Sequence, residues 1–180
     1  MSLHLVDSHI GQNSKGGLEI IEVYSETLIY PKGAQRPPPS QDVPKKYAED
    51  YIEACLVLPD SPKASAALSR RCLQHLLRFE ANVKHGDLYG EIQQVIDSKQ
   101  LPSHIAESID AIRHIGNFAA HPQKSTATGE IIKVETGEAE WNLNVLDALF
   151  DFYFVQRAIL SKKKDELNKK LLDAGKKPMK

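Results

Sequence analysis

Apolar residues recur at three- and four-residue steps through most of the chain after residue 43, and this spacing predicts amphipathic helices. The expected helices span 44–58, 61 to about 83, a segment from Asp87 to the turn at 101–103, a segment from that turn to Pro122, and about 138 to beyond 172. Ser61 and Asp87 are expected N-caps, since short polar side chains accept hydrogen bonds from the first free backbone N–H groups of a helix. The pattern therefore predicts an all-α fold, a bundle of four to five helices.

The segment before residue 44 follows a different pattern. Residues 18–30 are rich in β-branched and aromatic side chains and predict one or two short strands, or an extended arm. Residues 31–44 contain five prolines, which are typical of a stiff linker. Residues 1–17 are polar and contain glycine, so we expect disorder there. We divide the chain into an extended arm and Pro-rich linker (1–43), a helical bundle domain (44–160) and a basic C-terminal helix extension (161–180).

One hydrophobic core is expected to join the helices. Its predicted members are Leu68, Leu73, Leu76, Ile92, Ile109, Ile112, Leu146 and Leu149. On the second helix, one row holds Leu68, Cys72, His75 and Phe79, so His75 is expected in the core or at its boundary. Cys55 and Cys72 fit small core residues and not reactive thiols.

The last predicted helix has almost no polar face between Trp141 and Leu160. A helix that is hydrophobic all round is buried on several sides, and four or five helices rarely surround one helix fully. Phe118 also lies opposite the Ile109–Ile112 stripe of its helix and needs a second covering surface. We therefore expect a homodimer built by the fourth and final helices.

Composition limits the classes of function. The 180 residues are 41% hydrophobic and 26% charged with a net charge of −1, which gives no overall attraction to nucleic acid or membranes. The basic stretch 161–180 has two interpretations, a solvated helix face, which is the favoured one, or a nucleic-acid contact. The two cysteines form no CxxC, and no segment has the length of a signal peptide or a membrane span. We expect a cytoplasmic protein that binds no membrane, metal or cofactor.

The candidate site lies on the fourth helix. Arg113, Asn117 and His121 are spaced four residues apart and share one strip of the helix surface. His121 titrates near neutrality and can act as an acid or base, Arg113 can hold a phosphate, and Asn117 can orient either. Arg70 and Arg71 can add to a basic groove or can be solvated. In the structural alternative, Arg113 pairs with Asp110 or another carboxylate, and the other two residues cap the helix end.

Three segments together resemble the bacterial domain-of-unknown-function family DUF4145. They are YIEACLVLPDSPKASAALSRRCLQHLL, LYGEIQQVIDSKQLP and IDAIRHIGNFAAHP. The resemblance covers about 42–154 and implies membership of the HEPN superfamily of helical bundles, many of which are dimeric, metal-independent ribonucleases in toxin, restriction and phage-defence systems. In that superfamily a helix-borne Arg and His carry the chemistry, so the resemblance assigns those roles to Arg113 and His121. Seven residues separate the two here, more than in the superfamily pattern.

Two classes of function remain open from the sequence. The first is an RNA-directed protein of bacterial defence or restriction, either a ribonuclease or an inactive nucleic-acid-binding relative. The second is a non-enzymatic dimeric scaffold or interaction module that serves a neighbouring enzyme. A shared cleft for Arg113 and His121 at a dimer interface would favour the first class, and burial of the two side chains among partners in their own chain would favour the second.

Overall fold

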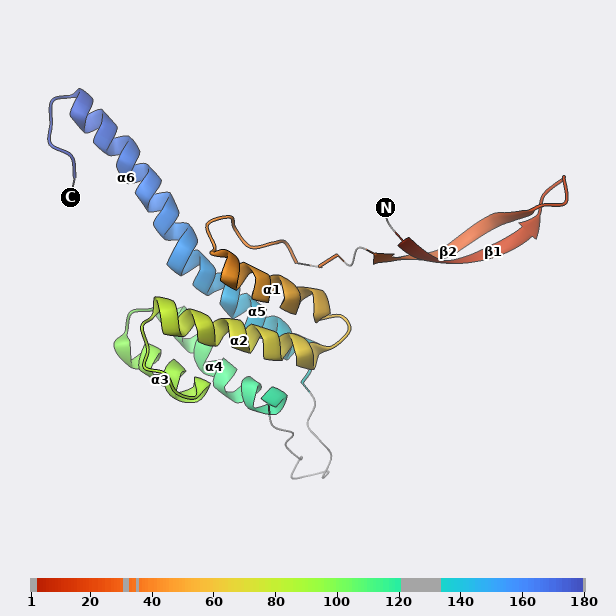
Figure 1. Cartoon of the computed structure of the whole chain (residues 1–180), viewed down its shortest axis with the longest axis horizontal. Coiled ribbons are helices and arrows are strands. Elements are labelled where there is room, and N and C mark those ends of the chain that lie inside the picture. Colours follow the sequence, from red (N-terminus) through yellow and green to blue (C-terminus); the bar gives the residue numbers. More distant parts are fainter. Residues whose placement is uncertain (1–2, 31–32, 35, 121–133, 180) are drawn as a thin grey trace. The chain divides into compact units, whose positions relative to one another are not determined.

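The computed structural model describes residues 3–30, 33–34, 36–120 and 134–179, and at residues 4, 27–30 and 114–120 it describes the backbone alone. The chain divides into two compact units, Met1–Gln35 and Arg36–Lys180. The first is a β-hairpin and the second is helical, so the fold is mostly helical with a small N-terminal sheet (Figure 1).

Strands β1 (Leu3–Gln12) and β2 (Leu18–Tyr30) pair antiparallel to form the hairpin. The expected strand at 18–30 is confirmed, whereas the disorder expected at 1–17 is wrong, because β1 occupies most of that segment. The turn explains how the polar segment folds. The Asn13 side chain accepts hydrogen bonds from the backbone N–H groups of Lys15 and Gly17, and Gly16 has a φ of +79° that glycine adopts without strain.

Helices make up the second unit. They are α1 (Lys45–Val57), α2 (Pro62–Glu80), α3 (Leu88–Ser98), α4 (Ser103–Ala120), α5 (Thr136–Phe150), the π-helical segment η1 (Asp151–Val155) and α6 (Gln156–Asp173). The expected caps are confirmed, since the Ser61 side chain accepts from the Ala64 N–H and the Asp87 side chain accepts from the Gly90 N–H. The long final helix is also confirmed, although it contains the unexpected η1 segment.

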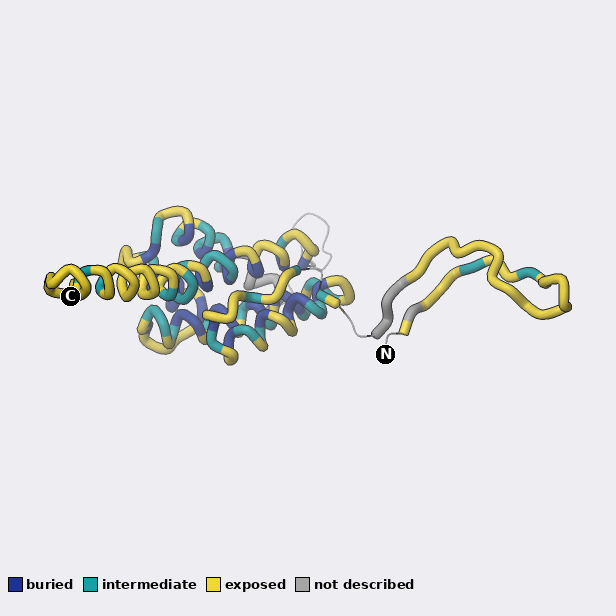
Figure 2. Tube along the Cα trace, turned by 90° about the horizontal axis from the view of Figure 1, so that it is seen from above, coloured by how far each residue is buried: buried dark blue, intermediate teal, exposed yellow. Residues whose placement is uncertain are grey.

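Helix α2 lies at the centre of the bundle and contacts α1, α3, α4 and α5. Buried residues line the inner faces of these five helices, whereas α6 has no buried residue and is exposed over most of its length (Figure 2). Seven of the eight predicted core residues are buried, and only Leu68 is half-buried.

The expected orientation of α2 is partly wrong. His75 is exposed and Phe79 is 55% exposed, while Cys72, Leu73, Leu76 and Leu77 are buried. The His75 ring instead packs edge-on against Phe79, and the Lys46 ammonium lies 4.4 Å from the centre of the Phe79 ring. His75 and Phe79 therefore lie at the outer edge of the α1–α2 contact, because Leu73, Leu76 and Leu77 belong to the buried face of α2.

The linker joins the bundle at Arg36. Its guanidinium donates hydrogen bonds to the Tyr51 hydroxyl (3.2 Å), to Asn144 Oδ1 (2.7 Å) and to Asp147 Oδ2 (2.6 Å). The Tyr51 hydroxyl also donates to Asp147 Oδ2 at 3.0 Å. These contacts tie the chain before α1 to both α1 and α5.

Candidate functional site

Arg113 projects from α4 toward α3, and its side chain is only 12% exposed. Its Nη1 donates a 2.7 Å hydrogen bond to Gln93 Oε1, and its Nη2 pairs with the carboxylate of Asp110. The guanidinium carbon lies 4.7 Å from the centre of the Tyr89 ring, a cation–π arrangement. The expected pairing of Arg113 with Asp110 is confirmed, and the guanidinium is held by partners within its own chain.

One donor of Arg113 remains unused. Its Nε is buried and has no hydrogen-bond partner. Burial of an unpaired donor has a free-energy cost, which the two hydrogen bonds and the stacked ring offset. With one face covered by Tyr89 and two nitrogens engaged, the guanidinium is not presented as an open fork for a phosphate.

The other two residues of the predicted strip are only partly described. Asn117 lies on α4 one turn after Arg113, which confirms that the two share one helix, but its side chain is outside the described residues. His121 lies wholly outside them. The meeting of the three side chains in one cleft therefore stays a prediction.

Arg70 and Arg71 face different helices. Arg71 Nη2 pairs with Asp50 Oδ1 at 2.7 Å and Glu53 Oε2 at 3.5 Å, both on α1. Arg70 is half-buried on the side of α3, where burial lowers its pKa and the nearby Asp87 carboxylate partly offsets that effect. Consecutive helical residues point about 100° apart, so only Arg70 faces the same helix as Arg113.

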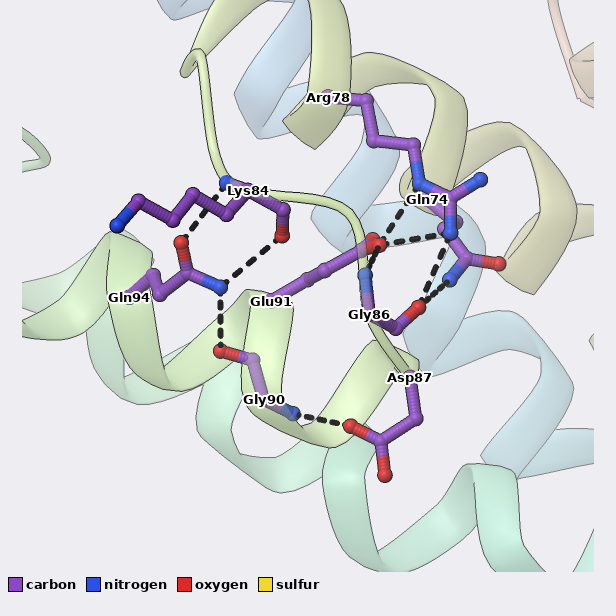
Figure 3. Close-up of polar contacts among 8 residues, drawn as sticks. All are labelled: Gln74, Arg78, Lys84, Gly86, Asp87, Gly90, Glu91 and Gln94. Atoms are coloured by element: carbon purple, nitrogen blue, oxygen red, sulfur yellow. Dashed lines mark hydrogen bonds and ion pairs between the residues drawn. The ribbon is translucent and has the colours of Figure 1, made fainter.

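A buried ion pair between Arg78 and Glu91, which we did not expect from the sequence, fixes the position of α3 (Figure 3). Glu91 is fully buried, and its Oε1 accepts a 2.7 Å hydrogen bond from Arg78 Nε and a 2.9 Å bond from the Gly86 N–H. Arg78 Nη2 also lies 2.7 Å from the same oxygen, as an ion pair. The other oxygen, Oε2, has no partner. The sequence did contain a sign of this pair, because Glu91 falls between Leu88 and Val95 on the apolar stripe of α3. An unpaired charge there would have a high free-energy cost, so a buried cationic partner could have been expected.

Further contacts hold the loop between α2 and α3. The Gln94 side chain accepts from the Lys84 N–H at 2.8 Å and donates to the Lys84 carbonyl at 3.1 Å. The Gly86 carbonyl accepts from Arg78 at 3.1 Å and from Gln74 at 3.3 Å (Figure 3). This network sets where α3 begins, and α3 carries the Tyr89 and Gln93 side chains that hold Arg113.

A pocket of about 180 Å³ lies between α4 and α5, away from Arg113. Its lining combines apolar Ile105, Trp141, Val145 and Ala148 with polar His104, Ser108 and Asn144. The Trp141 indole N–H donates to the Ser108 carbonyl at 3.2 Å, which fixes the ring across one end while leaving the residue 41% exposed. The pocket is small and mostly apolar, a form suited to apolar side chains of a partner.

In the described ranges, no group of His, Cys, Asp or Glu residues is arranged to hold a metal ion. No helix in the same part of the chain is long and apolar enough to cross a membrane. Cys55 and Cys72 are both buried and free, and burial raises the pKa of each thiol.

The family comparison matches residues 52–170 to the model described as "Domain of unknown function (DUF4145)". The chain belongs to the DUF4145 family. The match covers the bundle from within α1 to near the end of α6, so Arg113, Asn117 and His121 all fall inside the DUF4145 segment, while the β-hairpin precedes it. No curated protein and no solved structure gives a significant match to the chain.

Proposed function

We propose that this DUF4145 protein is a non-enzymatic interaction module, a mostly helical scaffold that binds protein partners and serves a neighbouring enzyme. The observation that carries the proposal is the state of Arg113. Its side chain is only 12% exposed and its guanidinium is bonded to Gln93 and Asp110, so binding a phosphate there would require breaking contacts that hold α3 on α4. We therefore assign Arg113 a structural role and look for binding sites on the exposed surfaces.

Two exposed surfaces support a role in assembly. Helix α6 has no buried residue, although Leu160, Leu167 and Leu172 lie on it. The hairpin exposes apolar side chains on both strands, including Ile10 (56%) and Ile20 (56%), which face each other across the sheet. Exposed apolar surface of this extent marks sites of interaction with other proteins.

Arg113→Ala tests the proposal when stability and RNA turnover are measured on the same variant. We expect the free energy of unfolding to fall by about 1–3 kcal/mol, because two hydrogen bonds of a charged group and its stacked ring are lost. We expect no cleavage of a mixed RNA pool by the wild type or the variant. The matched control is Arg71→Ala, whose side chain is 57% exposed and should lose less than about 1 kcal/mol. RNA cleavage by the wild type that Arg113→Ala abolishes without a loss of stability would refute the scaffold.

The second candidate is an RNA-directed HEPN-like protein of bacterial defence or restriction, either a metal-independent ribonuclease or an inactive nucleic-acid-binding relative. It is supported by the positions of Arg113 and Asn117 one turn apart on α4, with His121 four residues further in the sequence. On this alternative His121→Ala abolishes RNA cleavage and leaves thermal stability unchanged. Under either function we place the protein in the bacterial cytoplasm, where the free Cys55 and Cys72 thiols would stay reduced.

A further inference from the structure

The charge of the final helix is divided between its two halves. Residues 136–155, which form α5 and η1, carry four carboxylates and no lysine or arginine. Residues 156–173, which form α6, carry six lysine and arginine residues against three carboxylates. Two such helices attract each other when they lie antiparallel, because each acidic half then faces a basic half.

Helix α6 also carries an uncovered apolar stripe. Leu160 and Leu167 are 63% and 46% exposed, and they are seven residues apart, so they lie on nearly the same line along the helix. Leu171, which is half-buried, extends this line by one more turn. The structure contains a matching surface on α5, the pocket face bounded by Trp141 and Ala148, which are also seven positions apart.

The η1 segment aligns these two surfaces on one side of the helix. Twelve steps separate Ala148 from Leu160, which in an uninterrupted α-helix would rotate the second residue by about 120° from the first. A π-helical turn absorbs one additional residue, and the Gln156 N–H indeed bonds to the Asp151 carbonyl five residues earlier. The twelve steps from Ala148 to Leu160 therefore rotate by about as much as eleven steps of a regular α-helix. This leaves Leu160 within roughly 20° of Ala148 around the helix axis.

The leucine stripe cannot reach the pocket of its own chain. Helices α5 and α6 join through η1 without a break, so Leu160 lies about 18 Å further along the same helix than Ala148. Only another molecule can bring such a stripe to the pocket. A second copy of this chain supplies it, together with the opposite charge.

We propose that two copies of this chain pair through their final helices in antiparallel orientation, with the Leu160–Leu167 stripe of each copy against the α4–α5 pocket of the other. A register that sets Leu160 opposite Ala148 also sets Leu167 opposite Trp141, because both pairs are seven residues apart. The arrangement has a two-fold axis near Phe154, so each contact occurs twice and the assembly closes as a dimer.

The same register predicts the charged contacts beside the stripe. Glu140 is exposed next to Trp141, and Lys170 is exposed one turn after Leu167. By helical rotation both lie on the same flank of the paired surface, and along the axis they are about 3 Å apart in register. Glu140 of one copy therefore faces Lys170 of the other. This inference rests on the proposed role in assembly and names the partner.

Sedimentation velocity at micromolar concentration tests the pairing. We expect a dimer for the wild type, a monomer for Leu167→Asp, and a dimer for the control Leu172→Asp, because Leu172 is 59% exposed but lies about 140° from Leu167 around the helix. Glu140→Lys and Lys170→Glu should each weaken the dimer at least several-fold, and the two together should restore it. These residues are exposed in the single chain, so circular dichroism should show an unchanged helical fold for every variant.

Three results would overturn the antiparallel dimer. They are a monomeric wild type, a dimer that survives Leu167→Asp, and a charge reversal that the double variant fails to restore. None of them measures RNA turnover, so each leaves the scaffold proposal standing with a different partner. Conversely, RNA cleavage that depends on Arg113 would refute the scaffold and leave the dimer to be judged by sedimentation alone.

Discussion

The buried pair of Arg78 and Glu91 allows the sharpest test of what holds α3 in place. Glu91 is 0% exposed, whereas the Arg78 side chain is 25% exposed, so the two partners differ in what their removal leaves behind. Arg78→Ala leaves a buried carboxylate with a single donor, the Gly86 N–H. Glu91→Ala leaves a partly solvated guanidinium that still donates to the Gly86 carbonyl.

This asymmetry sets the expected magnitudes. Arg78→Ala should lower the free energy of unfolding by about 3–5 kcal/mol, the usual cost of leaving one buried charge without its partner. Glu91→Ala should cost less, about 2–3 kcal/mol, because water can reach the remaining charge. The double variant should cost less than the sum of the two by about 1–3 kcal/mol, because the second change removes the group that the first left unpaired.

Urea unfolding, followed by circular dichroism at neutral pH, gives the free energy of unfolding of the wild type, the two single variants and the double variant. The matched control is the exposed pair of Lys45 and Glu49, whose side chains are 87% and 64% exposed and whose coupling should stay below about 1 kcal/mol. Additive losses at Arg78 and Glu91, or a larger loss for Glu91→Ala than for Arg78→Ala, would refute the assignment of Glu91 as a buried charge held by Arg78.

Two further predictions concern the core. Ile112 is 1% exposed, so Ile112→Ala should lower the free energy of unfolding by about 2–5 kcal/mol in the same urea assay. The control Ile52→Ala, at a site that is 37% exposed, should lower it much less. Equal losses for the two variants would mean that α4 does not turn Ile112 into the core. Burial raises the pKa of the Cys72 thiol to about 12, from an ordinary value of 9.0. The unfolded thiol therefore ionises first as the pH rises past about 9, and stability should fall from there toward about pH 12. Cys72→Ala should make this alkaline loss measurably shallower, and an identical pH profile for variant and wild type would contradict the burial of the thiol.

The sequence by itself determined the local structure of the bundle. Ser61 and Asp87 cap their helices as expected, because an N-cap bonds to backbone groups only three residues away. The length of the final helix also followed from the unbroken pattern between about 138 and 172. At the candidate site, the shared strip of Arg113 and Asn117 and the pairing with Asp110 could be predicted, since both depend on positions within one helix.

The tertiary structure alone decided which neighbours these elements meet. Strand β1 forms because β2 supplies its hydrogen-bond partners, and a polar segment considered alone shows no sign of them. Gln93 and Tyr89 reach Arg113 from α3, and Arg78 reaches Glu91 from α2, across separations that no periodicity encodes. The η1 segment likewise changes which side of α6 follows the α5 surface. In each case the free energy of an arrangement depends on contacts between residues distant in sequence, and these exist only once the helices have packed.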